Sequence, residues 1–230
     1  MNLTEPVTPS GTVVLVHPIS GTVGCYKHLA ECLKSDASVV ALQSPGLEET
    51  PRYRSIPDLA SLYLLNLDMK ACVRPLCVGG WSMGGLIAAE MARLMLLEGN
   101  SPKCVVMIDT ALPDQKPRLK SMGSSRELIR YIKAMGGPLE ARDIERLIQL
   151  LDFHELAIQE YQPAVLQVPT LLLTANGSAS NMLPGGTMNW ARYMPDLKVV
   201  NLPADHHSIV RYPVVEGVAS WIKCILLERE

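Results

Sequence analysis

Hydrophobic residues gather in six short runs along the chain. The runs are TVVLV (12–16), SVVAL (38–42), PLCVGGW (75–81), CVVMID (104–109), PTLLLTA (169–175) and LKVVNL (197–202). Each has the length of a β-strand, is rich in Val or Leu and lacks polar alternation, which is typical of strands covered on both faces. We therefore expect six such strands.

Segments of helical period separate these runs. The clearest are residues 25–34, 56–68, 84–99 and 214–228. Strand and helix alternate from end to end, and this alternation predicts an α/β protein with a mostly parallel, doubly wound sheet. In such a sheet, ligands bind at the carboxyl ends of the strands.

One stretch interrupts the alternation. Between Asp109 and Pro169 lie two helical patterns, at 124–135 and 140–161, with no clear strand. We expect a helical insertion over about 112–166 on the active-site side, where such insertions act as lids. An ordinary packing layer is the alternative.

Length and composition place limits on the class of protein. At 230 residues we expect a single domain spanning 1–230. Hydrophobic residues make up 48%, charged residues 19%, and the net charge is −2, so neither disorder nor a nucleic-acid-binding surface is indicated.

The start lacks the apolar core of a signal peptide and no run of 18 apolar residues occurs, so we expect a cytoplasmic protein without membrane contact. The six cysteines form no C-x-x-C pair and are expected to be reduced thiols.

The sequence GGWSMGG contains the candidate nucleophile. Gly80, Ser82 and Gly84 form G-x-S-x-G, the spacing of a sharp strand-to-helix turn that exposes a serine at the top of a sheet. A predicted strand leads into this turn and a predicted helix leads out. We therefore expect Ser82 to be a nucleophile, the alternative being a structural glycine turn with a bystander serine.

A serine nucleophile needs a base and an acid to orient that base. In this fold class the chain order is serine, acid, histidine, and the base follows the last strand. Of the five histidines, His206 and His207 occupy that position, and the pattern alone leaves both as candidates.

The acid is located by exclusion. After the run at 169–175 no carboxylate occurs until Asp196, so the common position for the acid is empty. Asp109, at the carboxyl end of the preceding predicted strand, is therefore the expected acid. Asp205 is a weaker alternative because its side chain would point away from the ring of its neighbour.

Acyl transfer also needs two backbone N–H groups to bind the oxyanion. One comes from the residue after the nucleophile, here Met83, and the other from the loop after an early strand. In that loop, His17-Pro18-Ile19, proline has no N–H, so Ile19 is the candidate.

Four motifs together resemble the thioesterase domains that end polyketide, nonribosomal peptide and animal fatty-acid synthases. They are VHPISG, GWSMGG, the aspartate of MIDTALP, and DHHSIV, in the same order over nearly the full chain. The resemblance implies an α/β-hydrolase fold with a helical lid. It also implies release of an acyl chain, by hydrolysis or cyclisation, from the phosphopantetheine arm of an acyl or peptidyl carrier protein.

The resemblance also bears on the site residues. It aligns His206 with the base, although this chain has Ala204 where the family commonly has glycine, and a second histidine at 207. No metal or bound cofactor is expected, because the substrate arrives on the carrier. Two other functions remain open: a carboxylesterase for small free esters, and a binding module without chemistry.

The predicted lid carries a basic cluster. Its members are Lys116, Arg118, Lys120, Arg126, Arg130 and Lys133, with Glu127 as the one acid between them. Family resemblance implies an acidic, phosphate-bearing carrier, so this cluster is a candidate docking surface. A solvated helix face is the alternative.

Overall fold

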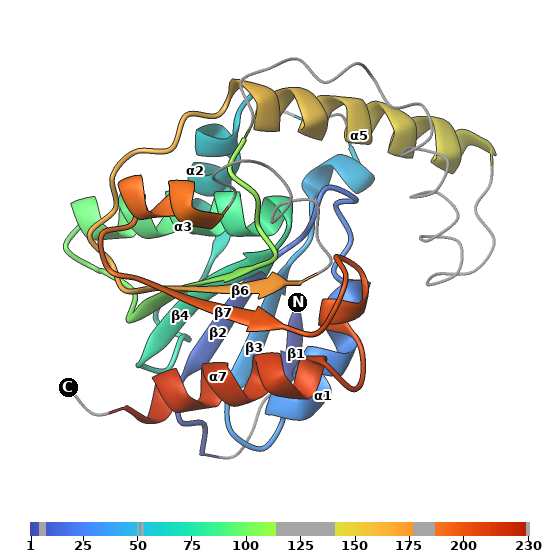
Figure 1. Ribbon diagram of the computed structural model, residues 1–230. Coiled ribbons are helices and arrows are strands. Elements are labelled where there is room, and N and C mark those ends of the chain that lie inside the picture. Colours follow the sequence, from blue (N-terminus) through green and yellow to red (C-terminus); the bar gives the residue numbers. More distant parts are fainter. Residues whose placement is uncertain (5–7, 50, 52, 114–140, 177–186, 229–230) are drawn as a thin grey trace.

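A computed structural model describes residues 1–4, 8–49, 51, 53–113, 141–176 and 187–228 (Figure 1). Within these residues the chain forms one seven-stranded sheet in the spatial order β1-β3-β2-β4-β5-β6-β7. The strands are β1 (Asn2–Thr4), β2 (Thr12–Val16), β3 (Ser38–Leu42), β4 (Leu76–Trp81), β5 (Cys104–Ile108), β6 (Thr170–Ala175) and β7 (Leu197–Leu202). Only β1 runs antiparallel to its neighbour.

Helices cover both faces of the sheet (Figure 1). On one face lie α1 (Lys27–Leu33) and α7 (Val215–Leu227), and on the other lie α2 (Ile56–Asn66) and α3 (Met83–Leu97). Helix α5 (Ala141–Glu160) lies beyond α2 and α3 (Figure 1). Four 3-10 helices complete the described elements, at Gly24–Tyr26, Pro45–Leu47, Thr187–Arg192 and Ser208–Val210. Across the described ranges, no helix combines the length and apolar character needed to cross a membrane.

The central strands explain the apolar runs. Val13 and Leu15 of β2 pack beneath α1 and α7, whereas Val14 and Val16 pack beneath α2 and α3. Successive side chains of a strand point to opposite faces, so a strand covered on both sides must be apolar at every position. The expected doubly wound α/β fold is confirmed.

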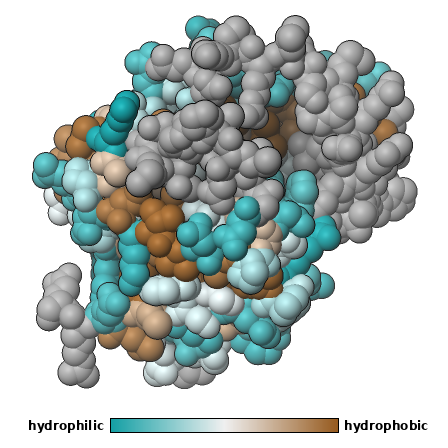
Figure 2. All heavy atoms as spheres, in the orientation of Figure 1, coloured by the Kyte–Doolittle hydropathy of each residue, from teal (hydrophilic) through white to brown (hydrophobic). Residues whose placement is uncertain are grey.

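The two edges of the sheet depart from the prediction. β1 was not expected, because a three-residue polar segment carries no periodic pattern. It is held instead by Thr4, whose Oγ1 donates to Ala37 O (2.8 Å) and accepts from Val39 N (3.0 Å). At the other edge the expectation of burial on both faces is wrong for β7, where Val199 is 40% exposed and hydrophobic residues reach the surface (Figure 2).

The helix expected at 140–161 is present as α5, whereas the helix at 124–135 lies outside the described residues. The buried Leu150 of α5 faces the loops that follow β2 and β3. A Cβ atom at Gly21 would lie 3.0 Å from Leu150 Cδ2, and one at Gly46 would lie 2.5 Å from Leu150 Cδ1. Glycine at these two positions therefore lets α5 sit directly on the loops beside the candidate site.

Candidate active site

Ser82 occupies a strained turn between β4 and α3. Its φ of 57° and ψ of −123° lie where a side chain is unfavourable, at a cost of about 1–3 kcal/mol. Two hydrogen bonds to the end of β5 and the segment after it hold this conformation: Ser82 N donates to Ile108 O (2.9 Å), and Thr110 Oγ1 donates to Ser82 O (3.0 Å). The structure thus has the strand-turn-helix setting that the motif predicted for this serine.

The two glycines of the motif are required by close backbone contacts. A Cβ atom at Gly80 would lie 2.4 Å from the carbonyl carbon of Gly84, and one at Gly84 would lie 2.2 Å from Val16 O. Real Cβ atoms do not approach backbone this closely. Helix α3 can therefore start against β2 and β4 only with glycine at both positions.

Two aromatic residues that the sequence did not single out stabilise this turn. The buried Tyr26 hydroxyl accepts from Trp81 N (2.8 Å) and donates to Val16 O, which joins the ends of β4 and β2. Trp190, also buried, donates from Nε1 to Thr110 O (3.0 Å). No motif marks either residue, because each acts through a partner distant in sequence.

Asp109 follows β5 and is held by three hydrogen bonds. Its backbone N donates to Leu173 O (2.7 Å), and its Oδ1 accepts from Ala175 N (3.0 Å). Oδ2 accepts from His206 Nδ1 at 2.6 Å, and the carboxylate is fully buried. Asp109 also has a positive φ, 45°, so this residue, like Ser82, is held in an unfavourable backbone conformation.

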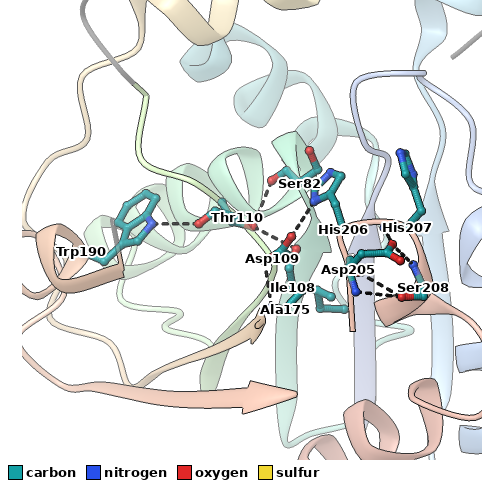
Figure 3. A network of polar contacts seen from close by, with 10 residues as sticks. All are labelled: Ser82, Ile108, Asp109, Thr110, Ala175, Trp190, Asp205, His206, His207 and Ser208. Atoms are coloured by element: carbon teal, nitrogen blue, oxygen red, sulfur yellow. Dashed lines mark hydrogen bonds and ion pairs between the residues drawn. The ribbon is translucent and has the colours of Figure 1, made fainter. Parts of the chain in front are cut away.

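His206 joins the acid to the candidate nucleophile. Its Nδ1 carries the hydrogen donated to Asp109, so in the neutral ring Nε2 keeps a lone pair that can accept a proton. Figure 3 shows the ring beside Ser82. The Trp81 ring packs against it, with centroids 5.0 Å apart. Ser82, Asp109 and His206, predicted from separate parts of the sequence, therefore lie together.

His207 and Asp205, the alternative base and acid, are oriented differently from His206 and Asp109. His207 is exposed, and Figure 3 shows its ring pointing away from Ser82. The Asp205 carboxylate accepts from His207 N (2.8 Å) and Ser208 N (2.9 Å), and these bonds lower its pKa. Asp205 thus shapes the loop that carries His206.

The two amides expected to bind an oxyanion also lie at this end of the sheet. Met83 is the first residue of α3, and Ile19 lies in the loop after β2. Within the described ranges neither N–H has a backbone acceptor, which for Met83 is expected of the first turn of a helix. Both amides remain candidate oxyanion donors.

Two cysteines in the core of the sheet are poor nucleophiles. Burial raises the pKa of the Cys77 and Cys104 thiols to about 12, which removes their nucleophilic form at neutral pH. All six cysteines are free, as expected.

Among the residues described, no three His, Cys, Asp or Glu side chains are placed to hold a metal ion. The six basic lid residues lie outside the described ranges.

The family model for the thioesterase domain matches residues 11–225. The chain belongs to this family. Membership implies a hydrolase, and it confirms the resemblance drawn from the four motifs. One similar solved structure is a four-domain nonribosomal peptide synthetase bound to AMP and glycine. It is 25% identical with a TM-score of 0.83, and the match covers 100% of this chain and 20% of that one. Another is the NocB thioesterase domain, which is 22% identical with a TM-score of 0.77, and the match covers 95% of each chain.

Curated relatives of this thioesterase-family chain include two from Aspergillus. The thioesterase pytI of Aspergillus terreus is 35% identical over 126 residues, which are 49% of this chain and 41% of the relative. The nonribosomal peptide synthetase agiA of Aspergillus flavus is 34% identical over 120 residues, which are 50% of this chain and 2% of the relative. The match thus covers less than half of either relative.

Proposed function

We propose that this chain is a serine thioesterase that releases an acyl or peptidyl chain from the phosphopantetheine thioester of a carrier protein. The observation that carries the proposal is the hydrogen bond from His206 to the buried Asp109, beside a serine at a strained elbow. Relatives named as nonribosomal peptide and polyketide synthases support the substrate class.

In the acylation step, His206 Nε2 takes the Ser82 proton as Oγ attacks the thioester carbon. Asp109 holds the ring in the required tautomer and stabilises the imidazolium that forms. When the C–S bond breaks, His206 gives its proton to the leaving thiolate, and the acyl group stays on Ser82.

The amides of Met83 and Ile19 stabilise the tetrahedral oxyanion in both steps, each such donor being worth about a hundredfold to a thousandfold in turnover. In deacylation His206 activates the second nucleophile. Water gives a free acid, whereas a hydroxyl or amine of the acyl chain gives a ring. Exclusion of water by the lid would decide between these products.

The basic residues of the predicted lid are proposed to dock the carrier. Opposite charge speeds the encounter between partners and is screened by salt. Replacing Arg126, Arg130 and Lys133 by Glu should slow release from a carrier-bound thioester several-fold, most at low salt, and leave a free thioester unaffected. Equal effects on both substrates would contradict docking at this cluster.

Two other functions need a direct test. A carboxylesterase of the same fold would favour oxygen esters over thioesters. A non-catalytic module is also considered, because one relative is named an inactive atromentin synthetase, from Paxillus involutus, 29% identical over 109 residues. In this chain His206 is bonded to Asp109 and its ring lies beside Ser82, which favours a catalytic role.

The deciding experiment incubates the protein with an acyl-pantetheine thioester and with the matched oxygen ester. Intact-protein mass is measured for an acyl adduct, alongside turnover. We expect an adduct and faster turnover with the thioester. Ser82→Ala should abolish both, since loss of a triad nucleophile costs on the order of a millionfold, whereas Ser220→Ala, on the exposed side of α7, should have no effect. Thioester cleavage by folded Ser82→Ala within tenfold of wild type would overturn the mechanism.

A further inference from the structure

A buried chain of hydrogen bonds links α5 to the loop that carries the oxyanion amide. His154 of α5 contacts Ile19 O through Nδ1 (2.7 Å) and the Tyr53 hydroxyl through Nε2 (2.9 Å). Tyr53 in turn contacts Ser44 Oγ (2.8 Å), which accepts from Gly46 N (3.2 Å). Because a carbonyl can only accept, His154 Nδ1 carries the hydrogen, so Tyr53 donates to Nε2 and Ser44 donates to Tyr53.

Burial keeps His154 neutral. His154 is fully buried, and desolvation lowers its pKa to about 4. The His17 ring stacks on it with centroids 5.2 Å apart, and burial, followed by the nearby His154, lowers the pKa of His17 to about 3. Among the residues that the structure describes, the hydroxyls of Tyr53 and, from α2, Tyr63 also face this pair. His154 is therefore neutral and keeps its hydrogen on Nδ1.

Hydrogen bonds hold the carbonyl groups of the two peptides that flank the Ile19 Cα. Pro18 O accepts from His17 Nδ1 (2.7 Å) and from Gly21 N (2.9 Å). In a planar trans peptide the C=O and the N–H point in opposite directions, so these bonds also set the direction of the Ile19 N–H. His154 holds the next carbonyl, that of Ile19 itself, so the peptides before and after the Ile19 Cα are both tethered.

We propose that His154 is a positioning residue for the oxyanion hole, which holds the Ile19 amide in the direction needed by the tetrahedral intermediate. The inference rests on the proposed function, in which Ile19 N–H is a donor. Helix α5 then does more than cover the site: through one imidazole it fixes a group that touches the reacting atoms. The alternative is that the same bonds only stabilise the docking of α5.

Two amide substitutions separate these possibilities. In His154→Asn the side-chain nitrogen takes the place of Nδ1 and keeps the bond to Ile19 O, while the contact with Tyr53 is lost. In His154→Gln the longer side chain reaches toward Tyr53, while the bond to Ile19 O is lost. Each variant keeps one polar contact of the buried imidazole, so a purely structural role predicts similar activity for both.

The measurements are kcat and KM for a free acyl-pantetheine thioester, and inhibition by a trifluoromethyl ketone analogue of the tetrahedral intermediate. Misplacing one oxyanion donor should cost less than removing it, so we expect kcat of His154→Gln to fall about tenfold to a hundredfold. KM should change little, and the affinity for the analogue should fall in parallel with kcat. His154→Asn should stay within about threefold of wild type.

Phe153→Leu is the matched control. Its ring contacts Tyr53 from the same helix, with centroids 5.2 Å apart, but supplies no hydrogen bond to the loop. Thermal unfolding is measured for every variant. We expect Phe153→Leu to lose stability without losing kcat. Equal kcat in the two amide variants, or a loss in Phe153→Leu equal to that of His154→Gln, would overturn the proposal.

Tyr53→Phe provides an independent test should the histidine variants fail to fold. Without the hydroxyl donor, His154 Nε2 loses its partner, while Nδ1 still donates to Ile19 O because that carbonyl can only accept. We expect kcat within about threefold of wild type at constant KM, and a loss of tenfold or more in the folded variant would contradict the inference. Wild-type protein without Ser82-dependent turnover would instead overturn the proposed function, so the two failures are distinguishable.

Discussion

Two pairs of neighbouring histidines in this protein have opposite surroundings. His206 and His207 lie on the loop after β7, where the His206 side chain is 36% exposed and bonded to a carboxylate. His17 and His154 are fully buried, stacked on each other, and bonded through Nδ1 to backbone carbonyls. All four are the same residue type within one domain, so only their surroundings differ.

The comparison shows how surroundings select the role of an imidazole. His206 is partly exposed and donates to a carboxylate, which stabilises the imidazolium in the proposed mechanism, so this ring is suited to take and return a proton. Desolvation in a dry interior disfavours the charged ring and lowers the pKa of His17 and His154 to about 3 and 4, although their carbonyl partners act in the opposite direction. The buried pair is therefore suited to holding backbone in place and unsuited to proton transfer at neutral pH.

The largest expected effect tests the exposed pair itself. His206→Ala should reduce kcat for the thioester by on the order of a millionfold, because Ser82 loses its base. His207→Ala should retain substantial activity, because the ring of His207 points away from Ser82. Steady-state kinetics on the two variants check this, and the reverse pattern would show that the two histidines have been assigned the wrong way round.

The partner of His206 should matter nearly as much. In Asp109→Asn the amide can donate to Nδ1, which moves the histidine hydrogen to Nε2 and removes the acceptor for the serine proton; a loss of about ten-thousandfold in kcat is expected. Asp205→Asn is the matched control, since its carboxylate accepts from backbone amides of its own loop. Full activity of folded Asp109→Asn would move the acid elsewhere.

The smallest effect concerns stability and the buried pair. The unfolded chain protonates His17 and His154 near their ordinary pKa of 6.5, while the folded chain keeps them neutral down to about 3 and 4. Stability rises with pH wherever the unfolded state binds more protons, so their effect is absent above that range and grows as pH falls from 6.5 toward 4. Each group removes at most about 1.4 kcal/mol of unfolding free energy per pH unit.

Urea unfolding over this pH range, in wild type and in His154→Asn, measures the contribution of the buried pair. The variant lacks one of the two titrating groups, so its unfolding free energy should fall less steeply with acid. Identical slopes for the two proteins would show that His154 is not kept neutral in the folded state.

Sequence pattern was sufficient wherever a local rule applied. The central strands are apolar at every position because both faces are covered, and the elbow glycines are required by backbone contacts at the turn. The pattern failed at the edges of the sheet, since β1 is held by the side chain of Thr4 and β7 lies at the margin with one neighbouring strand. Neither feature has a periodic signature.

By itself the sequence determined the order of the elements, the serine at the elbow and, by exclusion, the aspartate after β5. It left open which of two adjacent histidines meets that aspartate, and it gave no sign that His154 contacts Ile19. The bonds concerned join residues 97 and 135 positions apart. Only the tertiary structure decides such contacts, because the packing of the sheet and of α5 brings the partners together, whereas sequence patterns record only local geometry and burial.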